Sequence, residues 1–118
     1  MSNEFRQILE TFDNEFPDRE YTIEIVCPEF TSVCPKTGQP DFGVLTFTYV
    51  PAGKCLELKS LKLYFFSFRN KGIFYEAVVN AILDDLAGVL HPKQMTVTGD
   101  FAIRGGTAAT VKAEFTGS

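Results

Sequence analysis

The sequence has no tryptophan, a single histidine and three cysteines among its 118 residues, and positive charge is in deficit, since the formal net charge is −4. A negative net charge argues against general binding to nucleic acid, because such binding needs a positive field toward the phosphates. No apolar run reaches the roughly 18 residues of a membrane-spanning helix. The first residues also lack the basic and apolar regions of a secretory signal, so we expect neither a membrane protein nor an exported one.

The few cysteines do not form the pattern of a disulfide framework or of a zinc site. Cys27, Cys34 and Cys55 are odd in number and include no CxxC pair. This usage is typical of reduced thiols in a cytoplasm, which is where we expect the protein. The only histidine, His91, follows a predicted helix, so no structural metal is expected.

Apolar side chains are plentiful, at 45% of the residues, and they include twelve phenylalanines. This content predicts a globular chain, and the length predicts one domain over residues 1–118, with an N-terminal arm at 1–19. A domain of this size can fold alone, but a cleft enclosed by it alone would be shallow.

Residue periodicity predicts an α+β domain with the element order ββααββ. A period of two indicates strands, and a period near 3.6 indicates helices. After a short helical arm at 4–12, the expected strands are 21–26, 41–50, 95–103 and 108–115, and the expected helices are 58–70 and 74–90. Pro28 is expected to end the first strand and open a long loop over 28–40, and Gly72 suits a left-handed helix cap. This order is typical of an antiparallel sheet with both helices on one face.

Residues 57–64, with the sequence ELKSLKLY, begin the first predicted helix. Apolar side chains at the i, i+3 and i+7 spacing predict a buried stripe made of Leu58, Leu61 and Phe65. A different side of the helix carries three cations, Lys59, Lys62 and Arg69. Three cations within three turns can hold an anionic ligand, although a solvated basic face on an ordinary amphipathic helix is the alternative.

Cys34 and Asp41 are candidates for covalent chemistry. A thiol is a nucleophile as thiolate, which needs a partly exposed, electropositive setting, and Cys34 lies in the predicted loop. The alternative is a small apolar filler residue. Asp41 follows seven residues later, at the head of the next strand. A carboxyl group near a nucleophile can move the proton that a covalent addition requires, but aspartate is also common at strand starts.

Two further positions are suited to ligand binding. Glu76 lies at the start of the second predicted helix, where the helix dipole favours an acid. Its carboxylate could also accept two hydrogen bonds from an amidine-like edge, such as the N1–H and amino group of a guanine. Residues 104–106, Arg-Gly-Gly, form either a plain hairpin turn or a close backbone approach, with one cation, to a phosphate.

Together these segments resemble the short, single-domain NADPH-dependent 7-cyano-7-deazaguanine reductases of queuosine biosynthesis, the QueF family. The similarity lies within residues 25–106 and rests on CPEFTS at 27–32, CP at 34–35, TGQPDF at 37–42, ELKSLKLY at 57–64, SFRN at 67–70, Glu76 and RGG at 104–106. The octapeptide at 57–64 separates this reductase from relatives of the same fold, such as GTP cyclohydrolase I.

The resemblance implies the tunnelling fold, whose subunits assemble into barrel rings with sites between subunits. It implies that Cys34 adds to the nitrile carbon of the deazaguanine to form a covalent thioimide, while Asp41 supplies protons. Two hydrides from two NADPH molecules then reduce the carbon to an aminomethyl group. The sequence has no Rossmann glycine fingerprint, so side chains and interface backbone would have to hold the dinucleotide.

The same resemblance implies ligand-binding roles for several residues. Those expected at the NADPH phosphates are Lys59, Lys62 and Arg104. Those expected at the substrate are Glu76, which would hold its guanine-like edge, Glu57 and Ser60. One member of the expected catalytic set departs from the family, because Tyr75 stands where a histidine usually precedes the glutamate. The ordinary pKa of tyrosine, about 10, makes it a poorer proton shuttle at neutral pH, so we expect Tyr75 to orient the substrate or the nicotinamide.

Two other functions stay open. An amidine-forming relative would keep the thioimide but add ammonia in place of hydride, and the cations at 59, 62 and 104 argue against it because that reaction needs no nicotinamide. A protein that only binds a pterin or a purine would leave Cys34 dispensable. The partners expected from the resemblance are a small-molecule substrate and further copies of the chain, with neither nucleic acid nor membrane.

Overall fold

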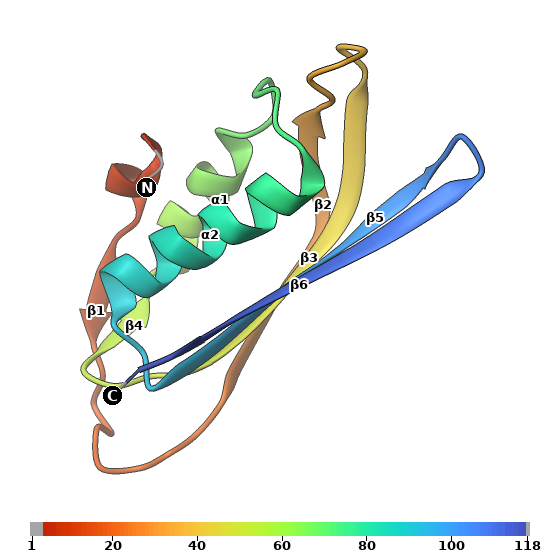
Figure 1. Cartoon of the computed structure of the whole chain (residues 1–118). Coiled ribbons are helices and arrows are strands. Elements are labelled where there is room, and N and C mark those ends of the chain that lie inside the picture. The colour runs from red at the N-terminus through yellow and green to blue at the C-terminus, as the bar shows by residue number, and fades with distance from the viewer. Residues whose placement is uncertain (1–3, 118) are drawn as a thin grey trace.

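A four-stranded antiparallel sheet forms the frame of the molecule in the computed structural model, which describes residues 4–117 (Figure 1). In spatial order its strands are β2 (Ile23–Val33), β3 (Pro40–Val50), β5 (Gln94–Arg104) and β6 (Thr107–Thr116). Both helices, α1 (Leu58–Phe66) and α2 (Tyr75–Leu90), cover the same face of this sheet (Figure 1). The predicted order ββααββ and the placement of both helices on one face are therefore confirmed.

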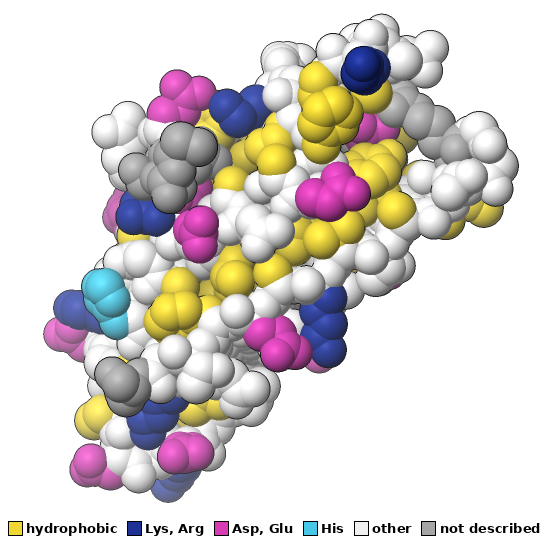
Figure 2. Space-filling view, in the orientation of Figure 1, with side chains coloured by type: hydrophobic (Ala, Val, Ile, Leu, Met, Phe, Trp, Pro, Cys, Tyr) yellow, Lys and Arg dark blue, Asp and Glu magenta, His cyan; other side chains and the backbone are white. Residues whose placement is uncertain are grey.

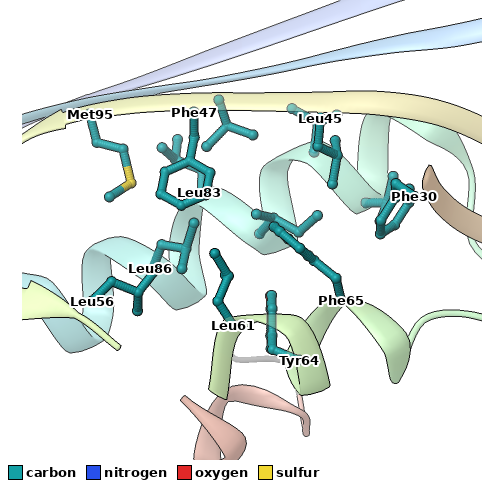
Figure 3. Close-up of a cluster of buried hydrophobic side chains, with 14 of the residues drawn as sticks. Phe30, Leu45, Phe47, Leu56, Leu61, Tyr64, Phe65, Leu83, Leu86 and Met95 are labelled. Atoms are coloured by element: carbon teal, nitrogen blue, oxygen red, sulfur yellow. The ribbon is translucent and has the colours of Figure 1, made fainter. Parts of the chain in front are cut away.

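The alternation along β3 divides the sheet into a covered and a bare face. Leu45, Phe47 and Tyr49 are buried against the helices, whereas Thr46 and Thr48 point to the other face. The sheet side chains meet those of both helices in one apolar core, in which the labelled residues point toward one another (Figure 3). They are Phe30, Leu45, Phe47, Leu56, Leu61, Tyr64, Phe65, Leu83, Leu86 and Met95.

β2 is longer than predicted, and the expected loop over 28–40 is correspondingly short. The strand continues to Val33 through a bulge between Cys27 and Phe30, so Pro28 does not end it. A proline is tolerated here because β2 lies at the edge of the sheet and a bulge needs fewer ladder hydrogen bonds. Only residues 34–39 remain to connect β2 with β3.

The buried side of α1 also differs from the predicted stripe. Leu61 is buried at 4% exposure, but Leu58 is 58% exposed. The buried side instead runs through Ser60 and Tyr64, because the Ser60 hydroxyl accepts a hydrogen bond from the Glu10 backbone N–H at 2.9 Å and fixes the rotation of the helix. The helix ends at Phe66 rather than near residue 70.

The predicted left-handed cap is at a different residue. Gly72 does not have a positive φ and instead forms an isolated parallel bridge with Val33. The left-handed residue is His91, with φ of 45° and ψ of 55°, which caps the C-terminus of α2.

The N-terminal segment is not the helix expected at 4–12. It contains a single 3-10 turn, η1 (Arg6–Ile8), followed by β1 (Thr11–Asp13), which pairs with the unpredicted strand β4 (Lys54–Leu56). Within residues 4–117, neither helix has the length and hydropathy needed to cross a membrane.

A buried carboxylate fixes this segment to both helices. The Arg6 Nε donates to Oδ1 of Asp85 at 3.0 Å, and the Tyr64 hydroxyl donates to Oδ2 at 2.6 Å. Because the Asp85 side chain is fully buried, these charge-assisted bonds hold η1, α1 and α2 together.

Candidate active site

A tight turn at 34–39 brings the two predicted catalytic residues to the adjoining ends of β2 and β3. The Cys34 backbone N–H donates to the Gln39 carbonyl at 2.9 Å, and the Gly38 N–H donates to the Cys34 carbonyl at 2.9 Å. Gly38 has φ of +72°, which a side chain would disfavour. Cys34 is half-buried at the end of β2, and Asp41 is the second residue of β3.

Tyr75, the first residue of α2, completes this cluster. Its hydroxyl donates to Oδ1 of Asp41 at 3.0 Å, although the two residues are 34 positions apart in the sequence. Asp41 is only 6% exposed. The predicted members Asp41 and Tyr75 are thus in direct contact.

A hollow of about 470 Å³ opens beside this contact. The residues that line it are Gln39, Pro40, Asp41, Phe42, Tyr75, Ala102 and Ile103. Its volume falls in the range of small-molecule sites, and its wall combines apolar surface with a few polar groups, as such sites do. The hollow is therefore a candidate place for a substrate next to Asp41.

Sequence reasoning missed Ser32, which lies two residues before Cys34. Ser32 is fully buried and pairs directly with Asp41 across the strands, and its hydroxyl has no hydrogen-bond partner among the described residues. An unsatisfied buried hydroxyl costs free energy, so Ser32 is a candidate site residue. The signal available in the sequence was its alternation with Phe30, which places the Ser32 side chain on the buried side of β2.

The other two cysteines are less suited to nucleophilic chemistry. Cys27 lies within β2, where burial raises the pKa of its thiol and disfavours the thiolate. Cys55 is buried in β4, with its sulfur 3.7 Å from the Tyr21 hydroxyl. Cys34, by contrast, is half-buried in the turn that leads into β3 and Asp41, although it does not line the hollow. Residues 4–117 bring together no group of three or more histidine, cysteine or acidic side chains suited to a metal.

Glu57 and Ser60 hold the start of α1. The Glu57 carboxylate accepts hydrogen bonds from the backbone N–H of Lys59 at 2.9 Å and of Ser60 at 2.7 Å, and these bonds lower the pKa of Glu57. The Ser60 hydroxyl donates to the Glu57 carbonyl at 2.8 Å. A role of either residue in substrate binding stays a prediction.

The predicted cations lie apart from the hollow. Lys59 and Lys62 are exposed on α1, and Lys62 lines a separate groove of about 880 Å³ between β2 and α1. Arg69 also lines that groove, beyond the end of the helix, with its guanidinium carbon 5.3 Å from the centre of the Phe66 ring. No residue of α1 lines the hollow at Asp41.

Glu76 and residues 104–106 lie in two other parts of the fold, the start of α2 and the turn between β5 and β6. Glu76 is exposed in the first turn of α2, directly after Tyr75. Gly105 and Gly106 have φ of 59° and 79° and form the turn between β5 and β6, and a phosphate contact at this turn stays a prediction. The side chain of Arg104 lies outside the described part of the chain, so its expected contact with NADPH stays a prediction.

A family model described as a QueF-like protein matches residues 40–117. The chain belongs to this family. The match includes Asp41, the octapeptide at 57–64, Tyr75 and Glu76, and it confirms the resemblance that the sequence motifs indicated.

Individual QueF proteins are similar to the chain over almost its whole length. Proteins named NADPH-dependent 7-cyano-7-deazaguanine reductase include one from Prosthecochloris aestuarii, which is 60% identical over 93% of this chain and 93% of its own length. One from Chlorobaculum parvum is 61% identical over 94% and 96%, and one from Chlorobium luteolum is 63% identical over 90% and 91%.

A solved structure shows the same fold. The apo form of the archaeosine synthase QueF-Like superposes with a TM-score of 0.75, covering 82% of this chain and 94% of that chain. The two sequences are 24% identical, so this likeness concerns the fold alone. The expected tunnelling fold is thereby confirmed.

Proposed function

We propose that the chain reduces the nitrile of 7-cyano-7-deazaguanine to an aminomethyl group with hydride from NADPH. The observation that carries this proposal is identity of 60–63% to reductases of that name over at least 90% of the chain. A half-buried thiol in the turn between β2 and β3 and a carboxyl group at the start of β3 support it, because the reaction needs a nucleophile and a proton carrier.

In this reaction the Cys34 sulfur bonds to the nitrile carbon and forms a thioimide. As the carbon–sulfur bond forms, one π bond of the nitrile is lost, and the net result is transfer of one proton from sulfur to nitrogen. We assign the transfer of that proton to Asp41, the second residue of β3. Tyr75, which takes the place of the usual histidine, completes the catalytic set.

The residues proposed to bind the substrate lie at the starts of the two helices and not on the β2–β3 hairpin that carries Cys34 and Asp41. Glu76 is exposed next to Tyr75 and can accept two hydrogen bonds from the guanine-like edge. Glu57 and Ser60 are the further substrate-binding residues. Both residues form hydrogen bonds that fix the start of α1. They would therefore contact a substrate bound between this helix and a neighbouring subunit.

The exposed cations fit the phosphates of NADPH. Lys59 and Lys62 are exposed on α1, Lys62 lines the groove of about 880 Å³, and Arg104 is the third expected contact. Two NADPH molecules, bound in turn, would each supply one hydride to the nitrile carbon, and the bond from that carbon to the Cys34 sulfur would break before the amine is complete. The chain's own residues would hold its phosphates through charge-assisted hydrogen bonds.

We also propose that copies of the chain assemble so that each site lies between subunits. Within one chain α1 contributes nothing to the hollow at Asp41, although the octapeptide carries four of the predicted site residues. Both edge strands have a side that a neighbour can extend, namely the outer side of β6 and the outer side of β2 before its bridge at Val33. The enzyme would work in the cytoplasm on a small molecule.

One mixing experiment tests the reaction. Purified protein is incubated with 7-cyano-7-deazaguanine, with and without NADPH, while nicotinamide absorbance and intact protein mass are followed. The reductase consumes NADPH with substrate and shows a covalent adduct without NADPH. Cys34→Ala should abolish both signals, whereas Cys27→Ala, the matched control in the preceding strand β2, should retain them.

The same measurement separates the competing functions. An amidine-forming enzyme would show the adduct but leave NADPH unchanged, and a binding protein would show neither. Undiminished turnover by Cys34→Ala would overturn the proposed mechanism.

A further inference from the structure

The Phe101 ring lies over two glycines and leaves no room for a side chain at either. A Cβ atom on Gly43, its partner across the strands, would lie 2.8 Å from this ring, and one on Gly99 would also lie 2.8 Å from it. Such separations do not occur between ordinary packed atoms, so both glycines are needed to let the ring lie flat on the sheet. Phe101 is 5% exposed and therefore has little freedom to move.

Phe101 in turn fixes the ring of Tyr75. The two rings stack with their centres 3.9 Å apart and their planes 9° from parallel. This stack and the backbone of α2, whose first residue is Tyr75, restrain the tyrosine from two sides. The hydroxyl at the end of this restrained ring donates to Oδ1 of Asp41.

We propose that Tyr75 is a positioning residue that holds the Asp41 carboxylate in the orientation needed to transfer the proton in thioimide formation. The proposal rests on the proposed function of Cys34 and Asp41. It assigns the effect of Tyr75 to the carboxylate, whereas the sequence led us to expect an effect on the substrate or the nicotinamide. Phe101, Gly43 and Gly99 then act through Tyr75 as its support.

Tyrosine is chemically suited to this task. Its hydroxyl stays protonated well above neutral pH, so it remains a hydrogen-bond donor throughout the reaction. A hydrogen bond to a carboxylate is stronger than one between neutral groups. Because misplacing a reacting group by about 1 Å can cost on the order of a hundredfold in rate, a fixed donor on Asp41 has a measurable effect.

The test measures adduct formation separately from substrate binding. Without NADPH, the rate of thioimide formation with 7-cyano-7-deazaguanine is followed by intact mass, and the dissociation constant is measured by equilibrium dialysis on a Cys34→Ala background. Tyr75→Phe keeps the stacked ring and removes the donor, so it should slow adduct formation about tenfold to a hundredfold. Its dissociation constant should stay within about threefold, a spread that corresponds to less than one hydrogen bond.

Two further variants complete the design. Phe101→Leu removes the flat support but keeps the hydroxyl, and it should also slow adduct formation without weakening binding. Tyr21→Phe is the matched control, because it removes a hydroxyl that donates to Asn14 at 2.6 Å near the opposite end of β2. That variant should form the adduct at the parental rate.

Parental rates in both Tyr75→Phe and Phe101→Leu would overturn the proposal. So would a loss of binding in Tyr75→Phe as large as the loss of rate, because the hydroxyl would then act on the substrate. If Tyr75→Phe fails to fold, Phe101→Leu decides. Absence of an adduct in the parental protein would instead overturn the proposed function.

Discussion

The Glu57 carboxylate stabilises α1 through two backbone hydrogen bonds, and its ionised form is the better acceptor. The N–H groups of Lys59 and Ser60, in that order of effect, lower the pKa of Glu57 below the ordinary glutamate value. A carboxyl group with a lowered pKa in the folded state stabilises that state above its unfolded pKa, and the contribution is lost as the pH falls through the folded pKa.

We therefore expect Glu57→Gln to lower the thermal unfolding midpoint at pH 7. Glutamine resembles the protonated acid, so the difference between variant and parent should shrink as the pH falls below about 4.3. Thermal melts followed by circular dichroism between pH 7 and pH 3 measure this difference. A gap that is independent of pH would show that the charge on Glu57 is not what stabilises the helix.

At the scale of one residue, Tyr64 shows that a member of a family motif can have a structural contact in the core. It ends the octapeptide that indicated the family, yet its hydroxyl donates to the buried carboxylate of Asp85 and not to an exposed site. The motif could be predicted to matter, but its division into exposed cations and buried structural groups could not. That division depends on Asp85, which lies 21 residues away in another helix.

At the scale of elements, residue periodicity predicted β3 correctly but failed for the end of β2 and for the buried side of α1. The alternation of β3 was decisive because a central strand has one buried and one bare face. The continuation of β2 past Pro28 could not be predicted, since it depends on β2 being an edge strand, and that is a property of the whole sheet. The rotation of α1 likewise depends on the bond between Ser60 and the Glu10 backbone.

The rotation of α1 predicts unequal effects for two leucines in the helix. Leu61→Ala should lower the free energy of unfolding by about 2–5 kcal/mol, because it leaves a cavity in the core. Leu58→Ala, the matched control, should change it by less than about 0.5 kcal/mol, because Leu58 is mostly exposed. Urea unfolding measures both changes. Equal losses of unfolding free energy would show that Leu58 is buried, as the spacing predicted.

At the scale of the whole molecule, a single chain leaves apolar surface uncovered. Hydrophobic side chains form a diagonal band on one face, with acidic and basic groups dispersed around it (Figure 2). The β5–β6 hairpin projects past the helices, and Ile103 near its end is 75% exposed (Figure 1). Continuous apolar surface of this kind is typical of contact sites between proteins.

The proposed assembly can be tested with two exposed phenylalanines that share a local setting. Phe66 lines the groove between β2 and α1, whereas Phe16 lines neither that groove nor the hollow at Asp41. Each phenylalanine has the guanidinium carbon of an arginine 5.3 Å from its ring centre. Phe66→Lys should shift the protein toward a monomer of 13.2 kDa and reduce turnover at least tenfold, on the order of one lost contact at an interface centre. Phe16→Lys should leave both unchanged.

Light scattering coupled to size-exclusion chromatography measures the oligomeric state. A monomeric parental protein with full turnover would contradict the assembly. The sequence could predict the residues of the candidate site one by one. It could not predict which subunit contributes each residue to a given site, so the assembly has to be measured. Asp41 and Tyr75 touch within one chain, and that contact depends on tertiary packing between residues 34 positions apart.

The cluster at Asp41 is assembled from parts that are synthesised far apart in time. Cys34 and Asp41 belong to one local hairpin, but the phenol that restrains the carboxylate comes at position 75, and the ring beneath it comes at position 101. Under the proposed mechanism, a nascent chain on the ribosome that has exposed only the hairpin carries the thiol without its organised proton donor. Covalent capture of a nitrile would thus reach its full rate only once translation is nearly complete and β5 has joined the sheet.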